Sequence, residues 1–423
     1  MEIKSIKGFE IIDSRGNPTV AATVTLEDGS SGTAFVPSGA STGQHEAIEK
    51  RDGDKTRYSG KGVLDAVGSI QTEIDPLLKG KNSDDLIAND QLMIDFDDTA
   101  NKSNLGANSI LAVSMASAKA AANSRKIPLY SFLNEKYSEF SKEEVIKNLP
   151  LPMMNILNGG AHADNPIDFQ EFMIQPNGFS SFAESLRAGI EVFHTLKGIL
   201  KSKGLSTSVG DEGGFAPNLK SPEEALDLIM IAIEKSGYKP GDQISLCLDI
   251  AATEFYSNSS YHLEGMKKSF TTIEMINYIK ELCLKYPITS VEDGLDEDDW
   301  EGWEKLTESI GTDVQLVGDD LFVTNPERIT KGVETHAANA VLVKVNQIGT
   351  LLETFDAIKT STKNNFQTVI SHRSGETEDT FIADLAVGVG SGQIKTGAPS
   401  RSDRVAKYNR LLMIEAETDL CLG

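Results

Sequence analysis

The chain has 423 residues and a mass of 45.7 kDa, a length that suggests a small domain beside a large barrel, or two to three domains. Lys and Arg number 40 and Asp and Glu number 63, so the net charge is −23. A surface this acidic repels phosphate backbones and anionic lipids, which argues against nucleic acid and membranes as partners; an anionic substrate would need local positive charge.

The three cysteines are odd in number and form no C-x-x-C pair, which argues against a disulfide framework and a structural zinc site. We expect Cys247, in the apolar run ISLCLD, to be buried. The N-terminal MEIKSIKGFE has no apolar signal segment, and no run of about 18 apolar residues occurs. We therefore expect a cytoplasmic globular protein, with a secondary surface or secreted pool left open.

The first part of the chain reads as a small α+β domain. Residues 1–36 are rich in β-branched residues with turn chemistry at DGSSG, which predicts an antiparallel meander. The Gly- and Ser-rich PSGASTGQHE of residues 37–46 predicts a mobile loop, and a helical pattern follows over 62–126. We expect an N-terminal α+β capping domain over 1–130.

Beyond a polar helical stretch that leads to Pro150, short apolar runs alternate with helical windows such as 222–237 and 350–362. Alternation of this kind is typical of a mainly parallel sheet with helices outside. The runs are apolar on both faces, as in a barrel whose strands are covered on each side. The predicted fold class is therefore α/β: an eight-fold β/α (TIM-like) barrel over 140–423 with the smaller α+β domain before it.

Six of these apolar runs end in a charged or ionisable residue: Asp249, Glu292, Asp319, Lys344, His372 and Lys395. The last four steps are 27, 25, 28 and 23 residues, close to one strand-plus-helix unit each. The carboxyl ends of parallel barrel strands meet at one rim, which is where barrel enzymes carry their active sites. Charges also mark simply where a strand meets solvent, but six in series favour a functional rim.

Three carboxylates converging on one point repel one another unless a cation lies between them. Asp249, Glu292 and Asp319 offer oxygen ligands only, which favours a hard cation such as Mg²⁺. The sequence leaves open the choice between Glu292 and Asp293 and between Asp319 and Asp320, and one of the acids could instead cap a helix. For the DEDDW run at 296–300 we expect the capping role.

Lysine is unusual at the end of an apolar strand. Lys344 beside a metal cluster is a candidate base for a weakly acidic C–H, provided that nearby cations lower its pKa. Alternatively, Lys344 and Lys395 only neutralise the acids. Glu212, between glycines in SVGDEGGFAP, is a candidate general acid facing Lys344.

Two further loops carry candidate ligands. HRSGE at 372–376 places Arg373 and Ser374 after a strand end, which suits an oxyanion such as phosphate. NGGAHADN at 158–165 places His162 in a glycine-rich loop, where surface exposure and a catalytic role are equally compatible with the pattern.

The chain resembles the enolase family over essentially its whole length, and its length is that of bacterial members. The resemblance rests on motifs that occur in the family's order: DSRGNPTV, VPSGASTG, NGGAHADN, QEFM, SVGDEGGFAP, VEDGL, QLVGDDLFVTN, VKVNQIGT, SHRSGETEDT and IKTGAPSRSDRVAKYN. It implies the Mg²⁺-dependent, reversible dehydration of 2-phosphoglycerate to phosphoenolpyruvate, a step of glycolysis and gluconeogenesis.

The resemblance also implies a role for each matching residue. Asp249, Glu292 and Asp319 would hold the first Mg²⁺, and Ser41, in the Gly-rich loop, the second. Lys344 would remove the C2 proton and Glu212 would protonate the leaving C3 hydroxyl, while Lys395 stabilises the carboxylate. Arg373 and Ser374 would hold the phosphate. The remaining site residues would be His162, Gln170, Glu171 and His372, with His162 and Glu171 assisting catalysis.

Departures from the family pattern fall outside these roles. Pro166 follows NGGAHADN where the family usually carries Asn, and would stiffen that loop. Ala21 and Met413 replace a Glu and an Arg that pair across the family's dimer interface, so we expect a homodimer or an octamer of dimers with apolar contact there. The competing readings are an epimerase of the same superfamily and a non-enzymatic scaffold or surface-binding protein.

Overall fold

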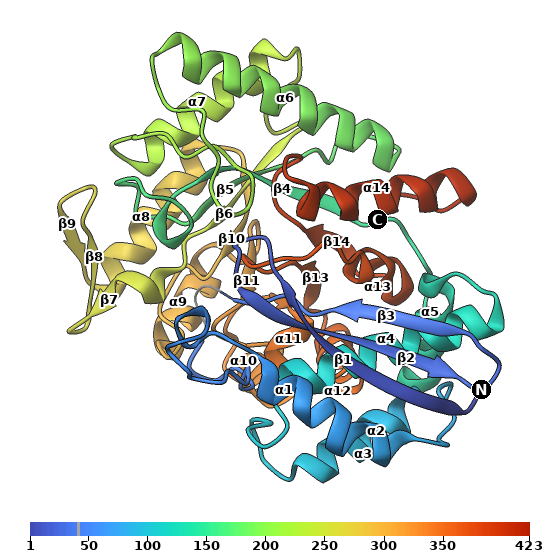
Figure 1. Cartoon of the computed structure of the whole chain (residues 1–423). Coiled ribbons are helices and arrows are strands. Elements are labelled where there is room, and N and C mark those ends of the chain that lie inside the picture. Colours follow the sequence, from blue (N-terminus) through green and yellow to red (C-terminus); the bar gives the residue numbers. More distant parts are fainter. Residues whose placement is uncertain (40–42) are drawn as a thin grey trace.

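The computed structural model describes residues 1–39 and 43–423. The N-terminal part begins with an antiparallel sheet in the order β1 (Ile3–Ile12), β2 (Pro18–Leu26) and β3 (Ser31–Phe35), which confirms the predicted meander. Its helices are α1 (Leu64–Ser69), α2 (Asp75–Leu78), α3 (Leu86–Asp97), α4 (Ala107–Arg125) and α5 (Leu129–Ser141). Figure 1 shows this sheet on one side of the molecule, at the blue end of the chain.

The Ala-rich α4 is buried along most of its length and packs on β2 and β3. Small side chains let the helix approach the sheet closely. A Cβ at Gly32 of β3 would lie 2.3 Å from the backbone nitrogen of Ala120, a separation that no side chain tolerates. The composition of this helix therefore reflects close packing against the sheet.

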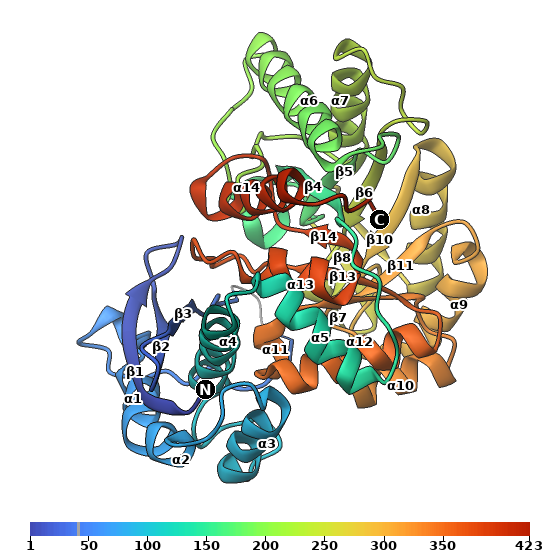
Figure 2. The same cartoon turned by 90° about the vertical axis from the view of Figure 1, so that its right-hand side faces the viewer.

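Among the described residues, eight strands form a closed barrel in the order β10-β11-β12-β13-β14-β4-β5-β6. Their bounds are β4 (Leu151–Asn158), β5 (Glu171–Gln175), β6 (Ser245–Asp249), β10 (Ile288–Glu292), β11 (Gln315–Gly318), β12 (Ala340–Val343), β13 (Gln367–Ser371) and β14 (Gly392–Lys395). This barrel beside the smaller domain of strands and helices confirms the predicted fold class (Figures 1 and 2).

One strand runs against the others. β5 pairs antiparallel with both β4 and β6, whereas the remaining neighbours pair in parallel. The chain passes from β4 to β5 without an α-helix between them, and α6 (Phe182–Ser202) and α7 (Pro222–Lys235) both precede β6. Because β5 is reversed, its first residue, Glu171, lies beside Asp249, the last residue of β6.

Helices cover the outside of the barrel: α6, α7, α8 (Thr272–Lys285), α9 (Trp300–Ile310), α10 (Pro326–Glu334), α11 (Val345–Ile348), α12 (Leu351–Lys363), α13 (Phe381–Val389) and α14 (Ser402–Glu417). Four of them begin after a Ser or Thr whose side chain accepts the N–H of a Glu three residues later: Ser181, Ser221, Thr271 and Thr350. Asp299 caps α9 in the same way, which confirms the predicted capping role of the DEDDW run.

A separate apolar cluster is formed by residues of the barrel strands alone: Met153, Met173, Cys247, Val317, Ala340, Leu342 and Val369. Cys247 is fully buried in it, as predicted. The barrel is therefore a packed core rather than a channel, and chemistry is confined to its ends. The small sheet of β7 (Tyr256–Ser257), β8 (Ser260–Leu263) and β9 (Lys268–Phe270) extends from the loop after β6.

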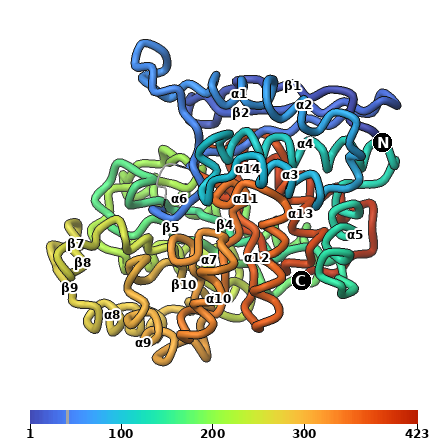
Figure 3. Tube along the Cα trace, turned by 90° about the horizontal axis from the view of Figure 1, so that it is seen from below, coloured from blue at the N-terminus to red at the C-terminus, as the bar shows by residue number. Residues whose placement is uncertain are grey.

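The two parts of the chain pack against each other through helices. Seen from below in Figure 3, α3, α4 and α5 lie beside α12, α11 and α13, and the contacts agree. Lys102 pairs with Glu353 and Lys119 with Asp379 across this boundary, each at 2.7 Å. None of the helices in the described part of the chain is long and apolar enough to cross a membrane.

Candidate active site

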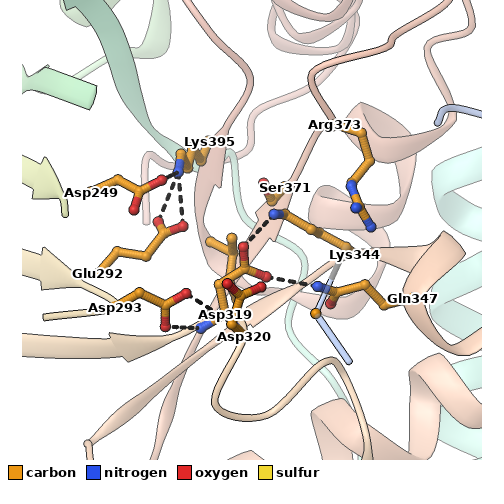
Figure 4. Close-up of polar contacts among 12 residues, drawn as sticks. Asp249, Glu292, Asp293, Asp319, Asp320, Lys344, Gln347, Ser371, Arg373 and Lys395 are labelled. Atoms are coloured by element: carbon orange, nitrogen blue, oxygen red, sulfur yellow. Dashed lines mark hydrogen bonds and ion pairs between the residues drawn. The ribbon is translucent and has the colours of Figure 1, made fainter. Parts of the chain in front are cut away.

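The charged strand ends meet at one rim of the barrel. Asp249, Glu292 and Lys395 are the last residues of β6, β10 and β14, and Asp319, Lys344 and His372 directly follow β11, β12 and β13. Strand pairing places Glu292 beside Asp249 and Ser371 beside Lys395. The rim therefore arises from the register of neighbouring strands, as the series of strand ends predicted (Figure 4).

Lys395 lies at the centre of a cluster of three carboxylates. Its Nζ donates to Asp249 Oδ2 at 3.1 Å and to both Glu292 oxygens at 2.9 Å, and it lies 3.2 Å from Glu171 Oε2. Burial opposes the charge of this amine, but the surrounding carboxylates outweigh burial and hold the pKa of Lys395 well above its usual value. Lys395 therefore carries a full positive charge at the floor of the site.

Lys344 holds the third predicted acid. Its Nζ forms an ion pair with Asp319 Oδ2, and Gln347 Nε2 donates to Asp319 Oδ1 at 2.8 Å (Figure 4). Burial lowers the pKa of Lys344, but the Asp319 carboxylate raises it more, so that the pKa lies above its usual value. This direction is opposite to the lowering expected from the sequence, because a carboxylate lies closer to the amine than any cationic group of the described residues.

The structure separates the two neighbouring acids that the sequence could not tell apart. Asp293 turns away from Lys395, and its oxygens accept the backbone N–H groups of Asp319 at 2.9 Å and Asp320 at 2.8 Å. It takes a positive φ of 42° to do so. Glu292 therefore faces the lysine, while Asp293 fixes the turn that carries Asp319.

The oxygens of the three predicted metal ligands do not all meet within 4.8 Å. Two other triads of the described residues do: His162, Glu171 and Glu212, and Asp293, Asp319 and Asp320. Asp249 and Glu292 are brought together around Lys395, whereas Asp319 is held by Lys344. The predicted ligands thus share one rim, but each is neutralised by a lysine in this structure.

The acids nevertheless fit a hard cation. Asp249 Oδ1 is buried and accepts no hydrogen bond from any described residue. Asp249 lies beside Glu292 on the neighbouring strand. A buried carboxylate oxygen that accepts no hydrogen bond and lies among other carboxylates is suited to coordinate a hard cation. The acidic rim can therefore hold a metal ion.

A second group of ionisable side chains faces the lysines. His162 Nδ1 lies 3.4 Å from Glu171 Oε1 and 3.6 Å from Glu212 Oε1. Asn155 Nδ2 donates to Glu212 Oε2 at 2.9 Å, and His372 Nε2 lies 3.4 Å from the same oxygen. All of these side chains are buried, so their charges interact strongly.

The surroundings of Glu171 and Glu212 shift the pKa values of these two glutamates in opposite directions. Burial and the charge of Glu212 raise the pKa of Glu171 well above its usual value. Burial also opposes ionisation of Glu212, but the His372 and His162 rings and Arg404 outweigh it and hold the pKa of Glu212 well below its usual value. Of the two carboxyl groups, Glu171 therefore holds a proton more readily and Glu212 ionises more readily. Burial lowers the pKa of His162 below its usual value and that of His372 to about 3, so the His372 ring is neutral at physiological pH.

One narrow cavity is lined by all nine residues that the sequence assigned to catalysis or substrate binding, together with Ser371: His162, Gln170, Glu171, Glu212, Lys344, His372, Arg373, Ser374 and Lys395. Gln170 Nε2 also donates to Asp249 Oδ2 at 3.2 Å, which links the cavity to the acidic rim. Ser41 lies outside the described residues.

Sequence reasoning assigned no role to several polar residues that contact this site: Glu46, Asn155, Gln347, Ser371 and Arg404. Glu46 closes the Gly-rich loop motif, and Gln347 and Arg404 belong to the quoted motifs VKVNQIGT and IKTGAPSRSDRVAKYN. The motifs therefore contained a signal. Ser371 is the last residue of β13, but the predicted run ended one residue later, at His372, and the other four residues do not end a strand.

Comparison with known protein families agrees with the architecture and the site. Residues 3–133 match the model of the enolase N-terminal domain, and residues 146–420 match that of the enolase C-terminal TIM barrel domain. The second match alone covers more than half of the chain. The family comprises lyases of the enolase superfamily, which typically bind a metal. The barrel, the charged rim and these two matches together show that the chain belongs to the enolase family.

Proposed function

We propose that this protein interconverts 2-phospho-D-glycerate and phosphoenolpyruvate plus water, in glycolysis and gluconeogenesis. The observation that carries the proposal is a single cavity lined by two lysine amines, Lys344 and Lys395, and by a carboxyl pair, Glu171 and Glu212, whose pKa values are shifted in opposite directions. A β-elimination next to a carboxylate needs both: a base for the C–H and an acid for the departing hydroxyl.

Lys344 is the proposed base. It takes the C2 proton, and the electron pair of that C–H bond forms the enolate of the substrate carboxylate. The carboxylate then carries a double negative charge, which is the reason why the proton is hard to remove. The buried Lys395 ammonium places positive charge at the floor of the cavity, where it stabilises this developing charge.

Glu212 is the proposed acid. In the second step the C2=C3 double bond forms as the C3–O bond breaks, and the hydroxyl leaves as water after accepting a proton. The opposite pKa shifts make Glu171 the more readily protonated carboxyl group of the pair, and His162 lies within 3.6 Å of both carboxyl groups. Glu171 and His162 therefore supply and position the proton that Glu212 delivers.

The phosphate of the substrate is proposed to bind Arg373 and Ser374, whose side chains line the same cavity as Gln170 and His372. A planar guanidinium matches phosphate geometry with two parallel hydrogen bonds. The positive charge of Arg373 would also attract an anionic substrate locally, although the protein as a whole has a net charge of −23.

Two Mg²⁺ ions per site are proposed as cofactors. Asp249, Glu292 and Asp319 would hold the first, and Ser41 would contribute to the second. When bound, the cations supply positive charge that stabilises the enolate and neutralises the carboxylates that otherwise raise the pKa of Lys344. The oxygen-only donor set and the unpartnered Asp249 Oδ1 support this assignment.

The decisive experiment is an absorbance assay for phosphoenolpyruvate with purified protein, 2-phosphoglycerate and Mg²⁺. We expect turnover that EDTA abolishes and added Mg²⁺ restores. Turnover of a carboxylate without a phosphate, and none of 2-phosphoglycerate, would instead favour an epimerase of the superfamily. No Mg²⁺-dependent turnover of any carboxylate would favour a non-enzymatic scaffold.

We propose a cytoplasmic location and assembly as a homodimer or an octamer of dimers. Met413 is 55% exposed on α14 and is available for apolar contact, whereas Ala21 is 1% exposed and already packed within its own chain. An apolar contact would therefore be made by Met413 with other exposed side chains such as Ile12. Sedimentation of wild type and Met413→Glu tests this: a charge on that side chain should weaken the dimer.

A further inference from the structure

We propose that Arg404 is a positioning residue that fixes the tautomer of His372 and joins the loop of Glu212 to the loop of Arg373 and Ser374. The inference rests on the proposed function for its catalytic consequence, but not for its structural content. Arg404 lies on α14, outside the barrel strands, and its side chain is fully buried. A buried guanidinium is costly unless its donors are satisfied.

The guanidinium meets acceptors from two separate loops. Its Nη1 donates to the Arg373 carbonyl at 2.6 Å and its Nη2 to the Ser374 carbonyl at 2.7 Å. Nη2 also donates to the Asp211 carbonyl at 3.1 Å, next to Glu212. One side chain therefore spans the backbone that carries the proposed acid and the backbone that carries the proposed phosphate ligands.

The contact with His372 decides where the imidazole carries its proton. Arg404 Nη1 lies 2.5 Å from His372 Nδ1. A guanidinium has donors only, so Nδ1 must be the acceptor, and a neutral ring then carries its hydrogen on Nε2. That nitrogen lies 3.4 Å from Glu212 Oε2. Burial lowers the pKa of His372 to about 3, so the ring is neutral at physiological pH.

The consequence for Glu212 is directional. With hydrogen on Nε2 the ring presents a donor to the carboxylate, whereas the other tautomer would present a lone pair and repel it. Asn155 donates to the same carboxylate oxygen. By fixing the tautomer of His372, Arg404 thus keeps the Glu212 carboxylate between two hydrogen-bond donors, Asn155 and His372, although Arg404 does not itself contact that carboxylate. Residues that contact a catalytic group's partner often orient the catalytic group in this way.

The fit around Arg404 is close. A Cβ at Gly397 would lie 2.9 Å from Arg404 Cδ and 2.8 Å from the Glu212 carbonyl oxygen, so this backbone packs directly on the arginine stem. A lysine in place of Arg404 keeps a positive charge, but its single amine lacks the planar fork that reaches all these acceptors. Arg404→Lys therefore removes the planar guanidinium but retains the positive charge. Arg404→Met removes the charge as well but retains an aliphatic side chain.

The first readout is the ¹⁵N shift of the His372 ring, assigned by its disappearance in His372→Gln. In wild type near neutral pH we expect hydrogen on Nε2 and a bare Nδ1; in Arg404→Met we expect a mixture of tautomers or the reverse one. A charged ring, or hydrogen on Nδ1, in wild type overturns the proposal even where the variants fail to fold. This readout needs no turnover, so it separates failure of the inference from failure of the proposed function.

The second readout is kinetic, per folded molecule. We expect dehydration to fall by about 10- to 100-fold in Arg404→Lys and further in Arg404→Met, with a raised KM and with exchange of the substrate C2 proton largely retained. The matched control is Arg410→Met on the same helix, where Arg410 pairs with Asp384 away from the site; it should leave both rates unchanged. Equal loss of exchange and dehydration, or wild-type dehydration in Arg404→Met, contradicts the positioning role.

Discussion

Glu46 and Arg373, which are 327 residues apart in the chain, form a buried two-point ion pair across the two domains. Arg373 Nη1 lies 2.9 Å from Glu46 Oε2, and Nη2 lies 3.2 Å from Glu46 Oε1. Gln347 Nε2 lies 3.3 Å from Glu46 Oε1 and 2.8 Å from Asp319 Oδ1, which connects this pair to the acidic rim. The N-terminal domain therefore contributes charge directly to the barrel site.

The Glu46–Arg373 ion pair predicts how removal of the Glu46 charge changes substrate binding. Glu46→Gln keeps the shape of the side chain but removes a negative charge next to the proposed phosphate site. We expect KM for 2-phosphoglycerate to fall, on the order of tenfold or about 1.4 kcal/mol, with kcat changed less. Steady-state kinetics at low ionic strength measure it, with the exposed Glu27→Gln as the control. A raised KM would show that Glu46 mainly orients Arg373.

Lys344→Met tests the base. The variant keeps the aliphatic stem but removes the amine that is paired with Asp319. We expect exchange of the substrate C2 proton with D₂O to fall by about 10² to 10⁴, as followed by NMR, and dehydration to fall with it. Lys4→Met, at an exposed position, is the control. Exchange at the wild-type rate in Lys344→Met would assign the base elsewhere.

Glu212→Gln separates the two steps. The amide keeps an oxygen for the Asn155 donor but has no proton to transfer, so dehydration should fall by about 10² to 10⁴. Because Lys344 is untouched, C2 exchange should persist. The ratio of the two rates is the measurement. Parallel loss of both rates would mean that Glu212 serves substrate binding or overall geometry rather than the acid step.

Metal binding is testable without turnover. A cation that binds only the folded state raises the free energy of unfolding by about 2.7 kcal/mol at 100 times its Kd. We expect Mg²⁺ to raise the melting temperature of wild type but much less that of Asp249→Asn, whose unpartnered Oδ1 is the proposed ligand. Asp242→Asn, exposed before the same strand, should respond as wild type. An identical response of Asp249→Asn and wild type to Mg²⁺ would place the ion at other residues.

Asp90 predicts a pH dependence of stability at the domain boundary. Its buried Oδ2 accepts hydrogen bonds from Leu352 N at 3.0 Å and Ser114 Oγ at 2.9 Å, so that it caps α12 from the N-terminal domain. Burial raises the pKa of Asp90 to about 7. Between about pH 4 and pH 7 the folded chain therefore holds a proton that the unfolded chain has released, and Asp90 lowers stability as pH rises through this window.

Asp90→Asn removes that titration. The free energy of unfolding of the variant minus that of wild type should rise with pH by up to about 1.4 kcal/mol per pH unit across the window and level off above it. Urea titrations at several pH values measure this slope. Any pH-independent effect of the Asn side chain on the free energy of unfolding is the same at every pH and does not contribute to the slope. Asp95→Asn, exposed on the same helix, should show no such slope. A flat difference would mean that Asp90 is already ionised in the folded protein.

The strand-end argument worked where the signal was local. A lysine or acid that closes an apolar run can be read from neighbouring residues, and parallel pairing then brings such ends to one rim. The same argument could not place Glu171, because that residue begins its strand. Glu171 reaches the rim because β5 runs antiparallel to β6, which brings the start of β5 beside the end of β6. It also could not choose between Glu292 and Asp293, whose directions depend on a backbone turn at positive φ. Only the resemblance pointed to Glu171.

By itself the sequence determined the succession of the barrel strands, the helix start at the DEDDW run and the two-domain plan, because these follow from periodicity and from hydrogen bonds within a few residues. Only the tertiary structure decided in which direction the pKa of each glutamate shifts, which lysine pairs with which acid, and that Arg404 and Glu46 reach the site from other parts of the chain. Those outcomes depend on burial and on charges brought within a few ångströms by folding, and neither quantity exists in an extended chain.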